Sequence, residues 1–139
     1  MTLFTSYFDN IKFMRKVSPN ICLVSIAGYC PSDFTGSVLK ELQPKKDWWK
    51  EWHKKFKANL ESPESIAWYK EAYTRTVLDK TSRLEVMKHL DEISNEVPVC
   101  LLCYETPDKF CHRKIVADWL RDGGYLCYEF DDGAAIAAQ

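Results

Sequence analysis

Three residues of types that often do chemistry in proteins are adjacent in the sequence: Cys111, His112 and Arg113. They lie where turn chemistry gives way to a helical pattern, so they are predicted to begin a helix whose first N–H groups lack intrahelical partners. The positive end of the helix dipole favours anions there and lowers the pKa of a thiol. Cys111 is therefore a candidate nucleophile, assisted by His112, and Arg113 a candidate holder of an anionic ligand.

The same stretch has a purely structural interpretation as well. Cys111 could pack beneath the start of the helix, and Arg113 could form an ion pair with Glu105 or Asp108. Glu105 directly follows an apolar run, where a carboxylate can act as a general base or hold a ribose hydroxyl. Tyr104 and, in an earlier loop, Tyr29 could stack on a base or sugar, although aromatics at a sheet edge often belong to the core.

Two nearly continuous apolar runs, Ile21–Ala27 and Val99–Tyr104, must position these residues. Their lack of alternation predicts strands covered on both faces, as in a parallel sheet. Each run leads into a polar segment, residues 28–36 and 104–113 respectively. Ligands bind beyond the carboxyl ends of such strands. If the two strands are neighbours, the two segments line one crevice.

Capped helices separate the apolar runs. A helix is expected from Pro44 through Phe56, a second after Ser62-Pro63-Glu64, and a third after the capping box that Ser82 opens. Another should follow Cys111 and end at Asp122-Gly123-Gly124. With further strands at 3–7 and 125–130, this alternation predicts a three-layer α/β domain with a mostly parallel sheet.

The segment Lys40–Lys57 combines several lysines with three tryptophans. Basic residues interleaved with aromatics are typical of grooves for single-stranded nucleic acid. Helical spacing, however, puts the two kinds mainly on different faces, which favours a core face and a solvated face. Nucleic-acid binding through Lys45–Lys57 is therefore the weaker hypothesis, and neither His53 nor His89 is assigned a role.

The six cysteines do not predict a disulfide framework. Cys22, Cys100, Cys103 and Cys127 lie in apolar strand-like runs and are interpreted as buried thiols. A zinc site could in principle gather Cys103, Cys111, His112 and Cys30, but no pair has the short knuckle spacing of structural zinc sites. Neither a metal nor a cofactor is predicted.

Around these residues the sequence resembles the domain-of-unknown-function 488 family. The resemblance rests on residues 101–113, Leu-Leu-Cys-Tyr-Glu-Thr-Pro-Asp-Lys-Phe-Cys-His-Arg, and on the apolar helix after them. It implies a small Rossmann-like domain with polar motif residues near the carboxyl edge of the sheet, and no particular reaction. Many relatives carry an arginine where this chain has Ala27-Gly28-Tyr29, so the resemblance supplies no second cationic anchor. Weaker similarity includes the Pro31-Ser32 turn, and Ser32 joins Arg113, Tyr104 and Tyr29 as a candidate ligand contact.

Length and composition predict one α/β domain over residues 1–130 and a flexible tail over 131–139. The formal net charge of -1 gives no overall field for nucleic acid or an anionic membrane, and no apolar run is long enough to cross a bilayer. We therefore expect a cytoplasmic domain that binds a nucleotide-like or other phosphorylated small molecule. Whether it is an enzyme acting on that ligand or a non-catalytic module that sequesters it stays open, and its oligomeric state is unknown.

Overall fold

The computed structural model describes residues 1–130, and the predicted flexible tail, 131–139, lies outside the described residues. Five strands form one sheet in the order β3-β2-β4-β1-β5, and every neighbouring pair runs parallel. The strands are β1 (Leu3–Tyr7), β2 (Cys22–Ser25), β3 (Ser37–Val38), β4 (Val99–Cys103) and β5 (Cys127–Glu129). The expected pairing of β2 with β4 is confirmed, with Val24 opposite Leu101.

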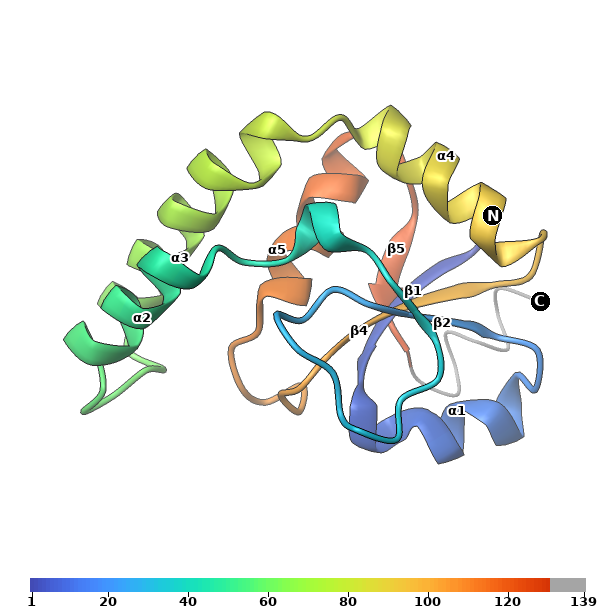
Figure 1. Ribbon diagram of the computed structural model, residues 1–139, viewed down its shortest axis with the longest axis horizontal. Coiled ribbons are helices and arrows are strands. Elements are labelled where there is room, and N and C mark those ends of the chain that lie inside the picture. The colour runs from blue at the N-terminus through green and yellow to red at the C-terminus, as the bar shows by residue number, and fades with distance from the viewer. Residues whose placement is uncertain (131–139) are drawn as a thin grey trace.

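Helices cover both faces of the sheet and make the fold a Rossmann-like three-layer α/β domain, as predicted (Figure 1). The α-helices are α1 (Ile11–Val17), α2 (Lys46–Lys55), α3 (Pro63–Thr76), α4 (Arg83–Ser94) and α5 (His112–Asp122). Short 3-10 turns occupy Phe8–Asn10, Lys40–Leu42 and Leu78–Lys80. None of the helices within residues 1–130 has the length and apolar character needed to span a membrane.

Alternating side chains of the strands enter two separate cores. Val99 and Leu101 of β4 pack with residues of α3, α4 and α5 on one face. Cys100 and Leu102 pack on the other face with residues around α1, among them Met14. All five side chains of β4 are buried, which explains why the strand reads as an unbroken apolar run.

The helix ends follow the capping signals of the sequence. Ser62 accepts a hydrogen bond from the backbone N–H of Ser65 at 3.1 Å, with Pro63 as the first residue of α3. Ser82 does the same for Glu85 at the start of α4. After α5 the chain turns at Gly124, whose φ of 89° is strained for any residue with a Cβ.

The segment after β2 contains a strand that the sequence did not predict. Ser37 and Val38 form β3, paired parallel with Val24 and Ser25 of β2. Two residues are too few to show a period, so this strand has no sequence signal. A Cβ at Gly36 would collide with the backbone oxygen of Leu23, so only glycine lets the chain approach β2 so closely.

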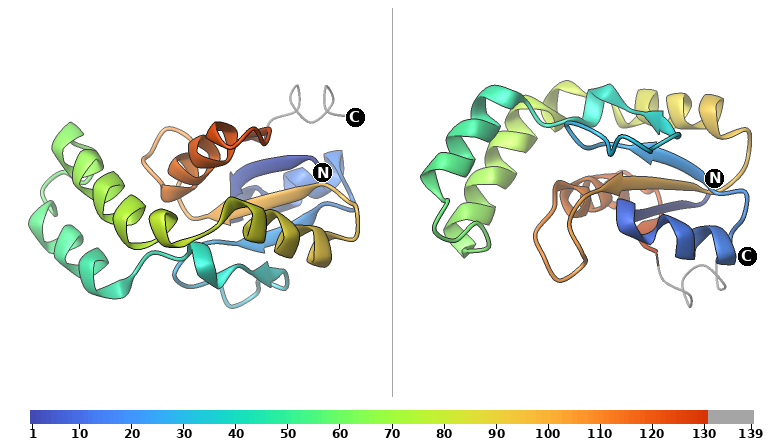
Figure 2. Two further views of the ribbon diagram at one scale, coloured as in Figure 1. Left: turned by 90° about the horizontal axis from the view of Figure 1, so that it is seen from above. Right: turned by 60° about the horizontal axis from the view of Figure 1, so that its bottom comes forward.

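The connections diverge at the carboxyl ends of β2 and β4. After β2 the loop stays on the α1 side, where its Phe34 packs, whereas β4 leads into α5, which packs on the opposite face. A crevice forms where successive connections leave a parallel sheet on opposite sides. α2 and α3 lie side by side beyond these strand ends and wall the crevice from a third direction (Figures 1 and 2).

Candidate functional site

A pocket of about 450 Å³ lies at the carboxyl ends of β2 and β4. Its volume is in the range of small-molecule sites, roughly 300–1,000 Å³. It brings together five of the candidate residues from two separate segments: Tyr29, Tyr104, Glu105, Cys111 and His112. The single crevice predicted between residues 28–36 and 104–113 is therefore present.

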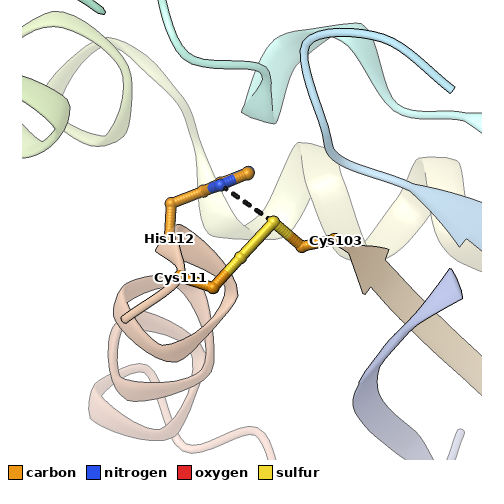
Figure 3. A group of neighbouring side chains, drawn as sticks. All are labelled: Cys103, Cys111 and His112. Carbon is orange, nitrogen blue, oxygen red and sulfur yellow. Dashed lines mark hydrogen bonds between the residues drawn. A yellow bond between two sulfur atoms is a disulfide. The ribbon is translucent and has the colours of Figure 1, made fainter. Parts of the chain in front are cut away.

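The cysteine at the helix start is not a free thiol in this structure. Cys111, the N-cap residue of α5, forms a disulfide with Cys103, the last residue of β4 (Figure 3). The expectations of a buried thiol at Cys103 and a free thiol at Cys111 are both corrected. The bond links the strand to the helix that follows it, eight residues later. This spacing matches no redox or zinc motif, so the bond could not be predicted from the sequence. Both cysteines line the pocket.

His112 lies between the disulfide and the end of β2. Its Nε2 is 2.7 Å from the backbone oxygen of Ile26, and its Nδ1 is 3.4 Å from Sγ of Cys103 (Figure 3). A carbonyl oxygen only accepts, so Nε2 carries the proton and Nδ1 keeps its lone pair. Burial lowers the pKa of His112 to about 4, and the nearby charge of Arg113 acts in the same direction. The imidazole is neutral near pH 7 and can accept a proton.

Arg113 lies outside the pocket lining. Its guanidinium is fully buried and forms a two-pronged ion pair with Glu129 of β5, with both N···O distances 3.0 Å. A third bond, 2.5 Å long, runs to the backbone oxygen of Glu105. The hypothesis that Arg113 forms an ion pair with Glu105 or Asp108 is wrong, because its partner is Glu129. The charge expected to hold an anionic ligand is thus already matched within the protein.

The remaining candidates differ in their placement. The Glu105 side chain is exposed and lines the pocket, with its carboxylate free of any ion pair among residues 1–130. Ser32 is exposed as well, but it is not part of the pocket lining. The loop thus contributes its beginning, Gly28 and Tyr29, rather than its middle.

Helix α2 provides a wall that the sequence analysis did not assign to the site. Lys46, Trp49, Lys50 and His53 line the pocket, and Trp49 stacks on His53 with ring centroids 5.1 Å apart. These four residues recur at spacings of three and four, so they form one stripe of the helix. Trp52 also lines the pocket, although most of its side chain is buried. The sequence analysis expected only a core face and a solvated face on this helix and did not identify this mixed stripe. Its spacing of three and four residues could have revealed it.

Aromatic rings make up much of the remaining lining. Tyr29 and Tyr104 lie against each other with centroids 5.0 Å apart, and Tyr29 is 71% exposed. Tyr69 of α3 contacts Phe110 edge to face, with centroids also 5.0 Å apart. Tyr104 was interpreted either as a core aromatic or as a ligand contact. Its placement is compatible with both, since it packs on Phe8 and lines the pocket.

Comparison with known proteins gives one match. A family model described as the active DUF488-N3 subclade matches residues 26–124, most of the chain and all of the pocket-forming segments. No curated protein and no solved structure matches. The resemblance read from residues 101–113 is confirmed by this match.

Proposed function

The chain belongs to the DUF488 family, and we propose that its pocket binds a nucleotide-like anionic small molecule. The observation that carries the proposal is the composition of the α2 wall. Lys46 and Lys50 flank Trp49 on one helical stripe, which offers two cations beside an aromatic face. A planar base with an attached phosphate has the complementary chemistry.

The cationic partner in this proposal differs from the one expected from the sequence. Arg113 is satisfied by Glu129, whereas neither Lys46 nor Lys50 has a carboxylate partner among residues 1–130. Both lysines are exposed and free to approach an anion. The start of α5 adds backbone N–H groups at the opposite side of the pocket.

The pocket also contains side chains that could act on a bound ligand, namely Glu105, His112 and the two cysteines. Glu105 offers a carboxylate for a hydroxyl or a proton, and His112 a neutral acceptor nitrogen. Cys111 becomes a nucleophile only after the bond to Cys103 is reduced. The cytoplasmic location belongs to the same proposal, because a reducing compartment keeps such cysteines as thiols.

Calorimetric titration tests the binding proposal directly. We expect adenosine or uridine monophosphate to bind more tightly than inorganic phosphate or ribose 5-phosphate, because only the nucleotides bring a base. The double variant Lys46→Ala/Lys50→Ala removes two charge-assisted hydrogen bonds of about 1.5–3 kcal/mol each, so it should weaken nucleotide binding by at least about a hundredfold. Lys54→Ala is the matched control, because Lys54 is exposed on the same helix but outside the lining.

Two results would overturn the proposal. One is that no member of the panel binds the wild type, and the other is that the double variant binds as tightly as Lys54→Ala. A short single-stranded oligonucleotide belongs in the panel too. If it binds far more tightly than the mononucleotides, the nucleic-acid hypothesis for Lys45–Lys57 replaces the small-molecule proposal.

An enzyme and a sequestering module are separated by a different measurement. Nucleotides incubated with the reduced protein are analysed by chromatography and mass spectrometry, beside the variant Cys111→Ser. An enzyme that uses the thiolate converts the ligand and loses conversion in the variant. A sequestering module returns the ligand unchanged, and the variant keeps nearly the same affinity.

A further inference from the structure

The floor of the pocket gathers three side chains of metal-ligating type. Cys103, Cys111 and His112 are each at least nine-tenths buried, with exposed fractions of 5%, 4% and 5%. One ligand atom from each lies within 4.8 Å of the others, and within residues 1–130 this is the group of such residues that could hold an ion. They come from the end of β4 and the start of α5 (Figure 3), so the fold itself fixes their separation.

The orientation of His112 is that of a metal ligand. Ligating histidines almost always donate their second ring N–H to a carbonyl or carboxylate, which fixes the tautomer and the ring. Here Nε2 donates to the backbone oxygen of Ile26 at 2.7 Å. The lone pair of Nδ1 is directed to the cysteine side, 3.4 Å from Sγ of Cys103.

We infer that the reduced Cys103–Cys111 pair and His112 together bind one thiophilic divalent cation, of which Zn²⁺ is the best fit. Two thiolates and one imidazole form a soft S₂N set, which favours zinc over magnesium or calcium. The two negative charges of the thiolates match the charge of the ion. The spacing of these ligands along the sequence differs from that of zinc-knuckle motifs, so the sequence pattern did not predict the site.

Binding requires the disulfide to be opened first. A dithiol or phosphine reductant supplies two electrons, the S–S bond breaks, and each sulfur takes up one proton. The cation then displaces both thiol protons, which leave to solvent as two sulfur–metal bonds form. Oxidation to the disulfide uses the same two sulfurs, so disulfide and metal exclude each other. The backbone sets the two Cα atoms 7.0 Å apart, just beyond the usual disulfide range of about 4.4–6.8 Å.

The pocket gives the ion both access and a vacant ligand position. All three side chains contribute to the pocket lining, so an ion can reach them from solvent. Three protein ligands leave one tetrahedral position for water or a ligand atom, as in catalytic zinc sites. This inference does not depend on the nucleotide proposal, because it concerns the cysteine–histidine floor and not the α2 wall.

Cobalt titration of the full-length protein tests the inference. The protein is reduced with a phosphine, freed of metal and titrated with Co²⁺ without oxygen. We expect one equivalent to produce sulfur-to-cobalt charge-transfer bands and the visible bands of tetrahedral coordination, and Zn²⁺ to displace it. Cys103→Ser and Cys111→Ser should each weaken binding by more than about tenfold. Cys22→Ser is the matched control, because Cys22 is a free cysteine at the opposite end of β2.

Alkylation gives a second readout that does not require any variant to fold. In the reduced wild type, Zn²⁺ should protect Cys103 and Cys111 from iodoacetamide while Cys30 is labelled at an unchanged rate. Any of three results would overturn the inference. They are spectra without charge-transfer bands, an equal loss of binding in Cys22→Ser, and labelling of Cys103 and Cys111 at a rate that Zn²⁺ does not change.

Discussion

His112 links the sheet to α5 through a single buried hydrogen bond to Ile26. The bond holds the imidazole in one tautomer, and burial keeps the ring uncharged. Its other nitrogen therefore faces Cys103 as an acceptor rather than a cation. The sequence analysis expected His112 to assist a free Cys111 thiol, whereas the observed ring is uncharged and Cys111 is bonded to Cys103.

The lowered pKa of His112 predicts a pH-dependent stability. Unfolded protein binds this proton near pH 6.5 and folded protein only near pH 4, so the free energy of unfolding decreases as pH falls through that interval. The loss approaches about 3 kcal/mol at the lower end. Urea unfolding of the oxidised, metal-free protein at pH 7, 6 and 5 measures it. His112→Gln should flatten the dependence, and an equally steep curve in that variant would assign it to other groups.

The ion pair of Arg113 with Glu129 predicts a second stability effect. Glu129→Gln leaves a fully buried guanidinium without its counter-charge. Removing one partner of a buried pair costs about 3–5 kcal/mol, and partial exposure of Glu129 reduces the expected loss to about 2–3 kcal/mol. Chemical denaturation gives the value. Glu41→Gln breaks the half-buried pair with His89, whose side chains are both partly exposed to solvent, and should cost less than about 1 kcal/mol.

Cysteine labelling checks the disulfide itself. Without reductant, iodoacetamide should leave Cys103 and Cys111 unmodified, and peptide mapping should find them joined. Reductant should make both reactive, ahead of Cys100 and Cys127. Burial raises the pKa of Cys127 to about 12 and that of Cys100 well above its ordinary value. Free Cys111 in the unreduced protein would contradict the bond.

At the scale of elements, α2 serves two purposes at once. One side of the helix buries Trp48 and Trp52 against α3, where Trp52 donates to Ser65 at 2.9 Å. The next stripe, with Lys46 and Lys50, faces the pocket. The core tryptophans thus fix the direction in which the pocket-lining lysines point. Substitutions on the buried side should therefore disturb ligand binding indirectly.

The helix caps predict local contributions to stability. Ser62→Ala removes the acceptor for the Ser65 N–H and should lower the free energy of unfolding by about 1 kcal/mol. Ser82→Ala should act similarly on α4. Thermal or urea unfolding measures both. Ser32→Ala in the exposed loop should change stability by less than about 0.5 kcal/mol. A loss there as large as at Ser62 would show that capping is not the cause.

Local features of the fold could be predicted from the sequence, whereas contacts between distant residues could not. Caps and apolar runs are local signals, so Ser62, Ser82 and the β2–β4 pairing were all predicted correctly. The partners of Cys111 and Arg113 lie on other strands, and sequence spacing does not reveal which strand end comes within reach. The helical spacing of Trp49 was visible in the sequence, but it was interpreted as part of the core face, so the pocket wall was not predicted.

At the scale of the whole molecule, the sheet order determines where ligands can reach the protein. The connections after β2 and β4 leave on opposite faces, and α2 and α3 project past the strand ends to close the third side (Figure 2). With a formal net charge of -1, the molecule has no strong overall field. Affinity for an anion must then come from local lysines, and it should decline with salt as those charges are screened.

Heteronuclear NMR titration with a nucleoside monophosphate is the sharpest test of nucleotide binding in the pocket, because it reports where a ligand binds as well as whether it binds. We expect saturable shifts at the Trp49 indole N–H and at the backbone amides of Gly28 and Phe110, which line the pocket. The amide of Leu84, exposed at the start of α4, should stay in place. No saturable shift, or shifts confined to residues outside the pocket, would show that the pocket is not a nucleotide site.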